Sequence, residues 1–241
     1  MNIKKGLHLI KKDVKGSLIE NKYALLLSTL LFIVPLFLGY LLSSSLREFM
    51  DPVLNAFKQK IVNGEIKLTA ESIFINNFKA ILIEYTGATF FGLITVANLI
   101  LNGLLVGYFG SKIDSKTFLL GITPHGIFEI PGLIIGGTAG FTLLYFIFNF
   151  IKDVTTYNTD PNPIQYTRHA NESYYNDEYF KRYEEKYFNK TKISKRFSYG
   201  INNNYKKLKQ SIILFSIATV LLVVAAFIEA KITPEIIHIF S

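Results

Sequence analysis

The apolar residues of this chain form four long blocks that contain no charged side chain. The blocks are residues 23–42, 87–109, 130–151 and, slightly shorter, 211–228. A helix needs about 20 apolar residues to cross about 30 Å of hydrocarbon, and only helices and closed barrels satisfy their backbone polar groups in lipid. Because the blocks lack the alternation of barrel strands, the pattern predicts an all-α fold. We expect a polytopic transmembrane helix bundle with at least four spans.

Two further segments have a mixed pattern. Residues 73–85 carry apolar side chains at helical spacing but are interrupted by polar and charged residues, which indicates an amphipathic helix at the membrane interface. Residues 117–128 contain no Asp, Glu, Lys or Arg but are broken by glycine and proline. This second segment is either a loop or a re-entrant segment that dips into the membrane.

Composition and charge support a membrane protein and exclude other classes. Half of the residues are hydrophobic (50%), only 18% are charged, and the mean hydropathy is +0.30, whereas soluble chains carry about 25% charge. The absence of cysteine excludes a disulfide scaffold. The net charge of +8 comes from lysines and arginines that flank the apolar blocks, so we expect a lipid bilayer and no nucleic acid as the partner.

Residues 1–22 form a basic segment with six lysines before the first span. A cleaved signal peptide has an apolar region of about 7–15 residues, and the block at 23–42 is longer. We therefore predict an uncleaved signal anchor in a multi-pass protein of the cell membrane. Basic residues remain on the cytoplasmic side, so the N-terminus is expected to be cytoplasmic.

The same rule conflicts with a simple count of four spans. The polar segment 152–209 is also basic, yet three crossings would place it on the side opposite the N-terminus. Either residues 117–151 form a hairpin or re-entrant unit, or the amphipathic segment 73–85 crosses as an additional span. The pattern leaves both repairs open.

The chain therefore divides into four parts. A cytoplasmic N-terminus (1–22) precedes a membrane domain (23–151), a polar tyrosine-rich loop (152–209), and a last span with the C-terminus (210–241). Within the loop, residues 171–188 read as a helix with tyrosines at i, i+4 spacing. Such a stripe could contact single-stranded nucleic acid or lipid headgroups, but we favour an amphipathic helix on the membrane surface or on its neighbours.

Ionisable residues near the spans are the strongest functional candidates, because burying them in a membrane is costly. His125 and Glu129 lie one helical turn apart, on the face that also holds three glycines, Gly132, Gly136 and Gly140. Small residues at four-residue spacing let membrane helices approach closely. If the helix begins only near residue 130, Glu129 caps its N-terminus instead.

The second span is the expected packing partner of this face. It has glycines at matching positions, Gly103 and Gly107, and a polar stripe that includes Asn98 and Asn102. The fourth span ends at Glu229. In a four-span bundle the end of the second span, the start of the third and the end of the fourth share one side, so we predict a polar core at one depth, made of Asn98, Asn102, His125, Glu129 and Glu229.

Three hypotheses fit this cluster. His125, Glu129 and Glu229 are suitable ligands for a divalent metal such as Zn²⁺, and the same three are the catalytic candidates. Two carboxylates in a low-dielectric pocket could also act in general acid–base chemistry or as a proton or ion site. The simplest hypothesis, which we favour, is a buried polar network that locks helix packing.

These residues also carry a family resemblance. The stretch from Thr123 to Pro131, with His125, Gly126 and Glu129, resembles the proline-histidine-glycine and glutamate-leucine-proline signature of the stage II sporulation protein M family. The asparagine-glycine span with Asn102 and Gly103 is similar to that family's second span. The residues from Glu229 to Pro234 resemble its closing element.

The resemblance implies an integral membrane protein that acts as a scaffold or assembly component of a membrane or envelope complex. Other membrane or envelope proteins, or further copies of the chain, would be its partners. The alternatives are a membrane-embedded metal-dependent hydrolase and, less favoured, a transporter or ion pathway. We accordingly expect no enzymatic activity rather than one.

Overall fold

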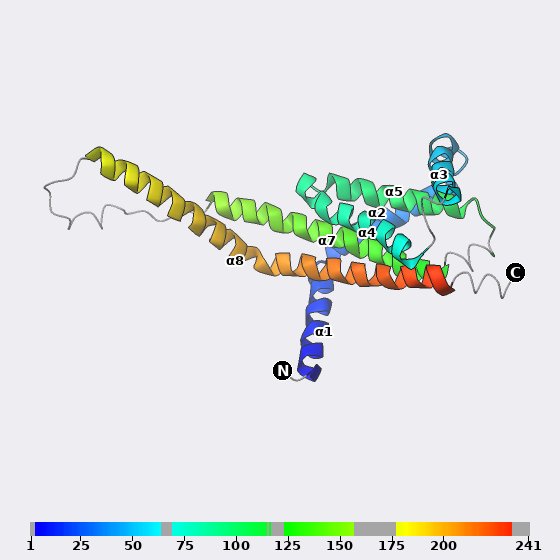
Figure 1. Ribbon diagram of the computed structural model, residues 1–241, viewed down its shortest axis with the longest axis horizontal. Coiled ribbons are helices and arrows are strands. Elements are labelled where there is room, and N and C mark those ends of the chain that lie inside the picture. The colour runs from blue at the N-terminus through cyan, green and yellow to red at the C-terminus, as the bar shows by residue number, and fades with distance from the viewer. Residues whose placement is uncertain (1–2, 64–68, 115, 117–122, 157–176, 233–241) are drawn as a thin grey trace. The chain divides into compact units, whose positions relative to one another are not determined.

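The computed structural model describes residues 3–63, 69–114, 116, 123–156 and 177–232, and every regular element within them is helical (Figure 1). This confirms the all-α fold. Four described helices or parts of helices are long and apolar enough to cross a membrane: Lys22–Leu41, Leu93–Gly110, Thr123–Thr156 and Ile193–Lys231. The chain divides into two compact units, residues 1–144 with 207–241, and residues 145–206. The first unit holds the candidate site.

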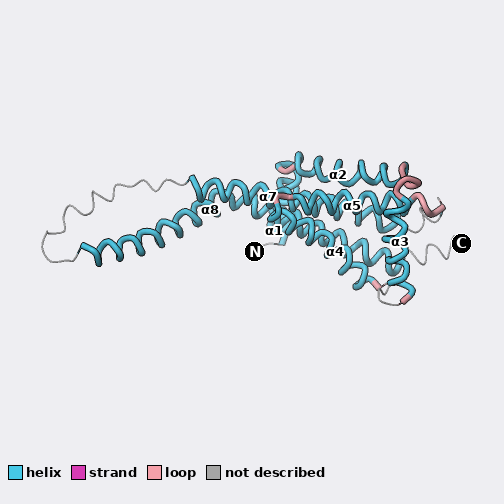
Figure 2. The backbone as a smooth tube through the Cα atoms, turned by 90° about the horizontal axis from the view of Figure 1, so that it is seen from above, coloured by secondary structure: helices cyan, strands magenta, loops and turns pink. Residues whose placement is uncertain are grey.

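Helices α2 (Lys22–Leu41) and α5 (Leu93–Gly110) lie side by side and run in the same direction (Figures 1 and 2). Residues later in α2 contact residues later in α5, which shows that the two helices are parallel. Gly103 of α5 lies against the backbone of Phe32, and Gly107 lies against that of Leu36. Two parallel spans require the chain to return to its starting end between them.

Helix α4 (Ala70–Thr86) makes that return. It lies against α5 in the opposite direction, because the Thr95 hydroxyl donates to the carbonyl of Glu84 (2.6 Å) and the Asn98 amide donates to that of Ala80 (3.1 Å). The predicted interfacial helix at 73–85 is therefore a packed member of the bundle. It therefore carries the chain back toward the end at which α2 begins.

A short turn separates α4 from α5. The 3₁₀ helix η1 (Gly87–Phe90) is followed by Phe91 and Gly92, both with positive φ (55° and 74°). The expected span at 87–109 therefore begins only at Leu93. The left-handed conformation at Gly92 suits glycine, which has no Cβ to strain it.

Helices α7 (Thr123–Thr156) and α8 (Asp177–Phe227), with the five-residue π turn η4 (Ile228–Ile232), complete the bundle. In the first unit, Leu144 of α7 lies beside Gly92, and Gln210 of α8 accepts a hydrogen bond from Asn21 (3.1 Å). Both connections to residues 145–206 thus leave the first unit at the end where α2 begins. We call this the α1 end, after helix α1 (Ile3–Glu20).

The opposite end is called the α3 end. Helix α3 (Arg47–Val62) follows α2 there, and its Asp51 accepts a hydrogen bond from the Tyr108 hydroxyl near the end of α5. With α4 counted, helix α1 and the two connections to residues 145–206 share one end of the first unit. An additional pass by the segment 73–85 is one of the two arrangements that the charge pattern left open.

One boundary expected from the sequence, the start of the third span, differs from the structure. Helix α7 begins at Thr123 rather than near residue 130, and it continues through Pro131, as membrane helices can when neighbouring helices compensate for the missing backbone donor. His125 and Glu129 therefore lie inside a helix, so Glu129 is not an N-cap. Residues 117–122 and 157–176 lie outside the described part, as does the start of the expected 171–188 helix.

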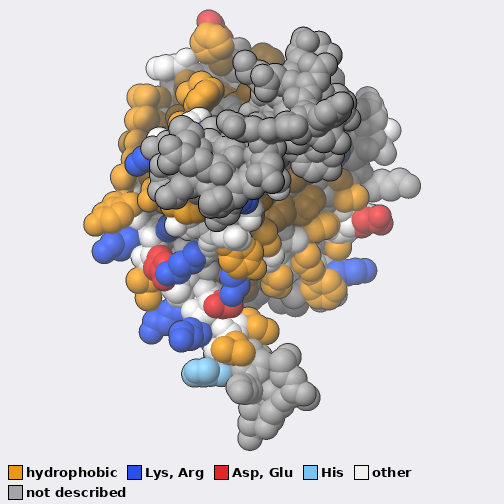
Figure 3. All heavy atoms as spheres, turned by 90° about the vertical axis from the view of Figure 1, so that its left-hand side faces the viewer, with side chains coloured by type: hydrophobic (Ala, Val, Ile, Leu, Met, Phe, Trp, Pro, Cys, Tyr) orange, Lys and Arg blue, Asp and Glu red, His pale blue; other side chains and the backbone are white. Residues whose placement is uncertain are grey.

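The core of the first unit is apolar and closely packed. Its fully buried members, Phe32, Ile81, Leu99 and Leu222, come from four different helices. Many large apolar side chains on the outer faces are exposed, and Figure 3 shows them on the face seen from the α1 end. An apolar exterior is what a bundle in contact with lipid requires.

The second unit pairs the end of α7 with α8. Asp153 accepts hydrogen bonds from Asn203 (2.6 Å) and Asn204 (2.7 Å), and the Phe150 and Phe197 rings pack edge to face at 5.5 Å. The side chains of the tyrosine stripe at residues 175–187 lie outside those described.

Candidate functional site

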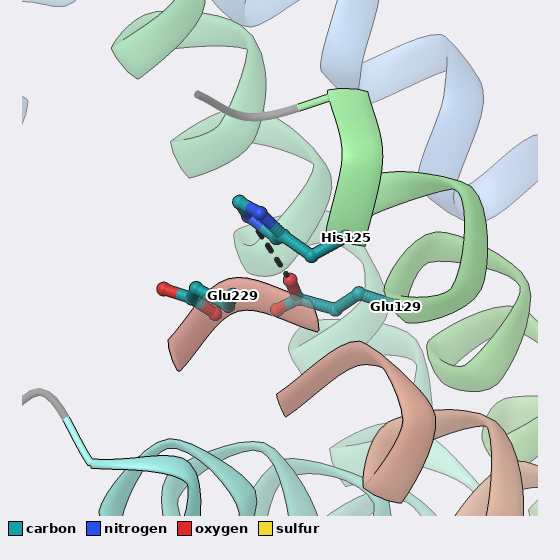
Figure 4. Close-up of side chains that lie close together, drawn as sticks. All are labelled: His125, Glu129 and Glu229. Carbon is teal, nitrogen blue, oxygen red and sulfur yellow. Dashed lines mark ion pairs between the residues drawn. The ribbon is translucent and has the colours of Figure 1, made fainter. Parts of the chain in front are cut away.

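Three ionisable side chains meet at the α3 end of the first unit (Figure 4). His125, Glu129 and Glu229 each offer one ligand atom, and these atoms lie within 4.8 Å of one another. His125 Nε2 is 3.9 Å from Glu129 Oε2. These are three of the five residues that the sequence pattern placed in one polar core.

The helices position the cluster from two sides. His125 and Glu129 are one turn apart on α7, so both project from the same face. Glu229 comes from η4, the wide turn that follows α8, and such π turns are frequent at functional sites. Asn77 of α4 also donates a side-chain hydrogen bond to Glu129, so three segments of the bundle contribute.

The cluster holds two carboxylates without a described basic partner other than the histidine. The side chains of His125 and Glu129 are only 12% and 25% exposed, and His125 Nδ1 is buried without a hydrogen-bond partner in the described structure. Like charges at this separation repel strongly where water is partly excluded. A proton or a bound cation between the carboxylates would remove that repulsion.

The donor set suits a small divalent cation. Imidazole nitrogen and carboxylate oxygen bind Zn²⁺ at about 2.0–2.2 Å, which places the ligand atoms of a tetrahedral site about 3.4 Å apart. The 4.8 Å spacing of the cluster is wider than this. Side-chain rotations that move the ligand atoms by roughly an ångström would close this gap. Three protein ligands would leave the fourth coordination position of the metal open.

A second polar group lies deeper in the first unit. Glu84 of α4 is fully buried, its Oε1 accepts from the Asn98 amide at 3.2 Å, and its Oε2 has no described partner. Gly136 of α7 faces that oxygen, since a Cβ at this position would lie only 2.7 Å away. The neighbouring carbonyl of Glu84 accepts from Thr95. This site is closed on every described side.

Asn98 and Asn102, both predicted as polar core residues, have different roles in the structure. Asn98 bridges α5 to α4, whereas the Asn102 amide donates back to the Asn98 carbonyl within α5 (2.8 Å). Asn102 is not placed in the His125 cluster.

Sequence reasoning missed Glu84 and Asn77 as functional candidates. Both lie on the helical face that carries the buried Ile73 and Ile81, at spacings of four, four and three residues. Buried apolar positions in register with Glu84 were the signal that could have identified it.

The glycines make close contacts, but with partners other than those expected. The sequence paired Gly132, Gly136 and Gly140 with Gly103 and Gly107. Instead, the glycines of α5 contact α2, Gly132 contacts Leu222 of α8, and Gly136 and Gly140 contact α4. Because α4 lies next to the glycines of α7, these glycines do not contact Gly103 and Gly107 of α5.

Comparison with known proteins agrees with these features. The family model for stage II sporulation protein M matches residues 28–234. An uncharacterized protein of Methanocaldococcus jannaschii is 29% identical over 220 residues, covering 89% of this chain and 96% of the relative. A second uncharacterized protein of that organism is 26% identical over 152 residues, covering 59% of this chain and 69% of the relative. No solved structure matches. With most of its length matched, including the segments that form the cluster, the chain belongs to the stage II sporulation protein M family.

Proposed function

We propose that this membrane protein binds a divalent metal ion, with Zn²⁺ as the best-suited ion, between His125, Glu129 and Glu229. The observation that carries the proposal is the convergence of one imidazole and two carboxylates from α7 and η4 within 4.8 Å. A divalent ion would neutralise both carboxylates. It would also bind His125 Nε2, the ring nitrogen that faces Glu129.

The number of protein ligands indicates what chemistry a metal bound here would support. Three protein ligands with one open position are typical of catalytic rather than structural zinc sites, and a zinc-bound water loses its proton near neutral pH. The supported activity is therefore hydrolysis of a substrate that reaches the α3 end of the bundle. Asn77, bonded to Glu129, would orient that carboxylate, as outer hydrogen bonds do in other metal sites.

Elemental analysis of the detergent-purified full chain tests the proposal. We expect about one divalent ion per chain in the wild type, and at least a tenfold loss in His125→Gln and Glu229→Gln. Glu71→Gln is the matched control, because Glu71 is an exposed glutamate in the first turn of α4 and should leave the metal content unchanged.

The melting temperature with added metal provides a test that does not depend on whether the metal was lost during purification. Added metal at about 100 times its dissociation constant would stabilise the folded state by about 2.7 kcal/mol, and this gain should vanish in the two site variants alone. A wild-type protein without metal, and without a metal-dependent rise in melting temperature, would exclude the metal site.

A scaffold or assembly role is the second function, and a separate observation favours it. The helices touch backbone to backbone at glycines: a Cβ at Gly103 or Gly107 would overlap a carbonyl of α2, and one at Gly140 would overlap the carbonyl of Glu84. Such contacts make the described core a rigid support rather than a moving pathway.

Native mass spectrometry of the protein, extracted together with its surrounding lipid from the source membrane, tests assembly. A scaffold should emerge in complexes heavier than the 27.4 kDa chain, and His125→Gln with Glu229→Gln should leave that mass unchanged. A uniformly monomeric chain would contradict assembly, and a mass that depends on the two cluster residues would link assembly to the metal.

We also propose that the α1 end faces the cytoplasm and that the metal cluster opens toward the opposite side. The support is the lysine content of the α1 end, with Lys15, Lys22 and Lys207 near the start of the spans. Single cysteines, Lys22→Cys and Asp114→Cys, in a chain without native cysteine, should react with impermeant reagent from opposite sides of the membrane. Labelling of both from one side would reject this topology.

A further inference from the structure

Helix α1 runs across the direction of the spans instead of along them (Figure 1). It joins α2 at Asn21 and extends outward at the end of the first unit. A helix in this position lies parallel to the membrane surface when the spans stand upright. Its two faces therefore decide whether it rests in the bilayer interface or in water.

The two faces of α1 differ in chemistry. His8, Lys11, Lys12 and Lys15 follow the i, i+3, i+4, i+7 spacing of one helix face, and all four are exposed. On an adjoining face Ile10 and Val14 are one turn apart, and Leu18, one turn further, lies at the border with Lys11, which precedes it by seven residues. Ile10 is 62% exposed, a cost that water would impose and lipid would remove.

The acidic side chains of α1 are turned elsewhere. Asp13 accepts from Lys209 at 2.7 Å, and Glu20 accepts from Gln210 at 2.9 Å. Both partners belong to the part of α8 in the first unit. Because the acidic groups face α8, the lysine face keeps its positive charge.

A polar joint fixes the direction of α1. The Asn21 amide donates to the Ser17 carbonyl (2.7 Å) and to Gln210 (3.1 Å), while Lys207 donates to the Asn21 side chain (2.8 Å). Ser17 itself is buried. These bonds hold the helix at the level where α2 and the last span begin. Figure 3, seen from this end, shows lysine and arginine side chains gathered over the lower part of that face.

We propose that α1 is a binding site for anionic lipid headgroups, with Lys11, Lys12 and Lys15 facing the phosphates and Ile10, Val14 and Leu18 inserted among the acyl chains. Charge complementarity selects anionic over zwitterionic lipid, since each lysine near such a surface contributes about fivefold to the binding equilibrium. The site is independent of the metal cluster, which lies at the other end of the first unit.

The test uses the full chain in nanodiscs with one cysteine, Ile10→Cys, carrying an environment-sensitive fluorophore. Quenching by spin-labelled lipid reports whether this face of α1 is inserted. We expect stronger quenching in discs that contain phosphatidylglycerol than in pure phosphatidylcholine. The combined change Lys11→Gln, Lys12→Gln and Lys15→Gln should lower the docking equilibrium about 100-fold, and high salt should act in the same direction.

The matched control changes lysines at the other end, Lys112→Gln with Lys116→Gln, and should leave the quenching as in the parent. A label at Val14→Cys, one turn from Ile10 on the same face, provides a second position in case Ile10→Cys disturbs the helix. Equal quenching in neutral and anionic lipid, or quenching that survives the triple substitution, would overturn the proposal. So would a label that remains exposed to water in every disc.

Discussion

Two sites in the first unit contain glutamates, and their surroundings differ. Glu84 is fully buried between α4, α5 and α7 and is bonded to Asn98. Glu129 and Glu229 lie at the α3 end, partly exposed, beside His125. The same side-chain type is enclosed by helix packing in one place and left accessible in the other.

The difference indicates which of these carboxylates can bind an exchangeable cation. A closed polar group must find its partners within the protein, so its removal costs folding energy. An accessible pair of carboxylates is costly in itself and becomes favourable when a cation binds. Among these three glutamates, stability should therefore respond most at Glu84, and metal content should respond only at Glu129 and Glu229.

The largest expected loss of stability comes from a substitution that disrupts the packing around the buried Glu84. In Gly140→Ala the new methyl group would overlap the Glu84 carbonyl, forcing α4 and α7 apart at a cost of about 3 kcal/mol. Thermal unfolding in detergent measures the loss. Gly16→Ala in α1 has no neighbour within 4 Å and should be neutral or slightly stabilising. An unchanged melting temperature in Gly140→Ala would contradict the packing.

The next effect compares two replacements of Glu84. Glu84→Ala leaves a cavity and removes one of the two acceptors of the Asn98 amide, which should cost about 2 kcal/mol. Glu84→Gln retains an oxygen for the 3.2 Å bond and should cost much less. The two melting temperatures check this, with metal content unchanged in both. Equal losses would mean that the hydrogen bond contributes nothing.

A smaller effect with the opposite sign is expected at the open site. In metal-free protein, Glu229→Gln removes the repulsion with Glu129 and should stabilise the fold by about 1 kcal/mol. Melting in excess chelator measures this. A substantial destabilisation there would mean that Glu229 is held by the protein, as Glu84 is.

The smallest effect concerns an exposed carboxylate outside the spans. The hydrogen bond from Tyr108 is the main reason that the pKa of Asp51 lies below its ordinary value, with Arg47 and Lys112 adding to it against a desolvation effect that opposes them. A lowered pKa in the folded protein means that this contact stabilises the fold above the ordinary pKa, about 3.9. The stabilisation is lost as the pH falls through the lowered value.

A fluorophore at Phe49→Cys on α3 should therefore report a transition below about pH 4. Tyr108→Phe should move this transition upward, toward the ordinary pKa, and by more than Arg47→Gln does. The reverse order of the two shifts would contradict the assigned cause.

The sequence predicted the fold class and the ends of the helix bundle that share one side. The blocks at 23–42 and 211–228 are long and uncharged, so each favours a helix regardless of its neighbours. The i, i+4 spacing of His125 and Glu129 depends only on helix geometry. What the sequence left open was where α4 lies, because its mixed pattern with Lys79 and Glu84 fits an interfacial helix as well as a packed one.

The sequence by itself thus determined that this chain is helical, lies in a membrane, and carries a histidine and two glutamates at the margins of its spans. Those properties follow from local hydrophobicity and helical periodicity. Tertiary structure alone decided that α4 returns between two parallel spans, that Glu84 becomes enclosed, and that Glu229 joins His125 and Glu129. Such outcomes depend on which glycine faces allow backbones to touch, and that choice is made by all the helices together.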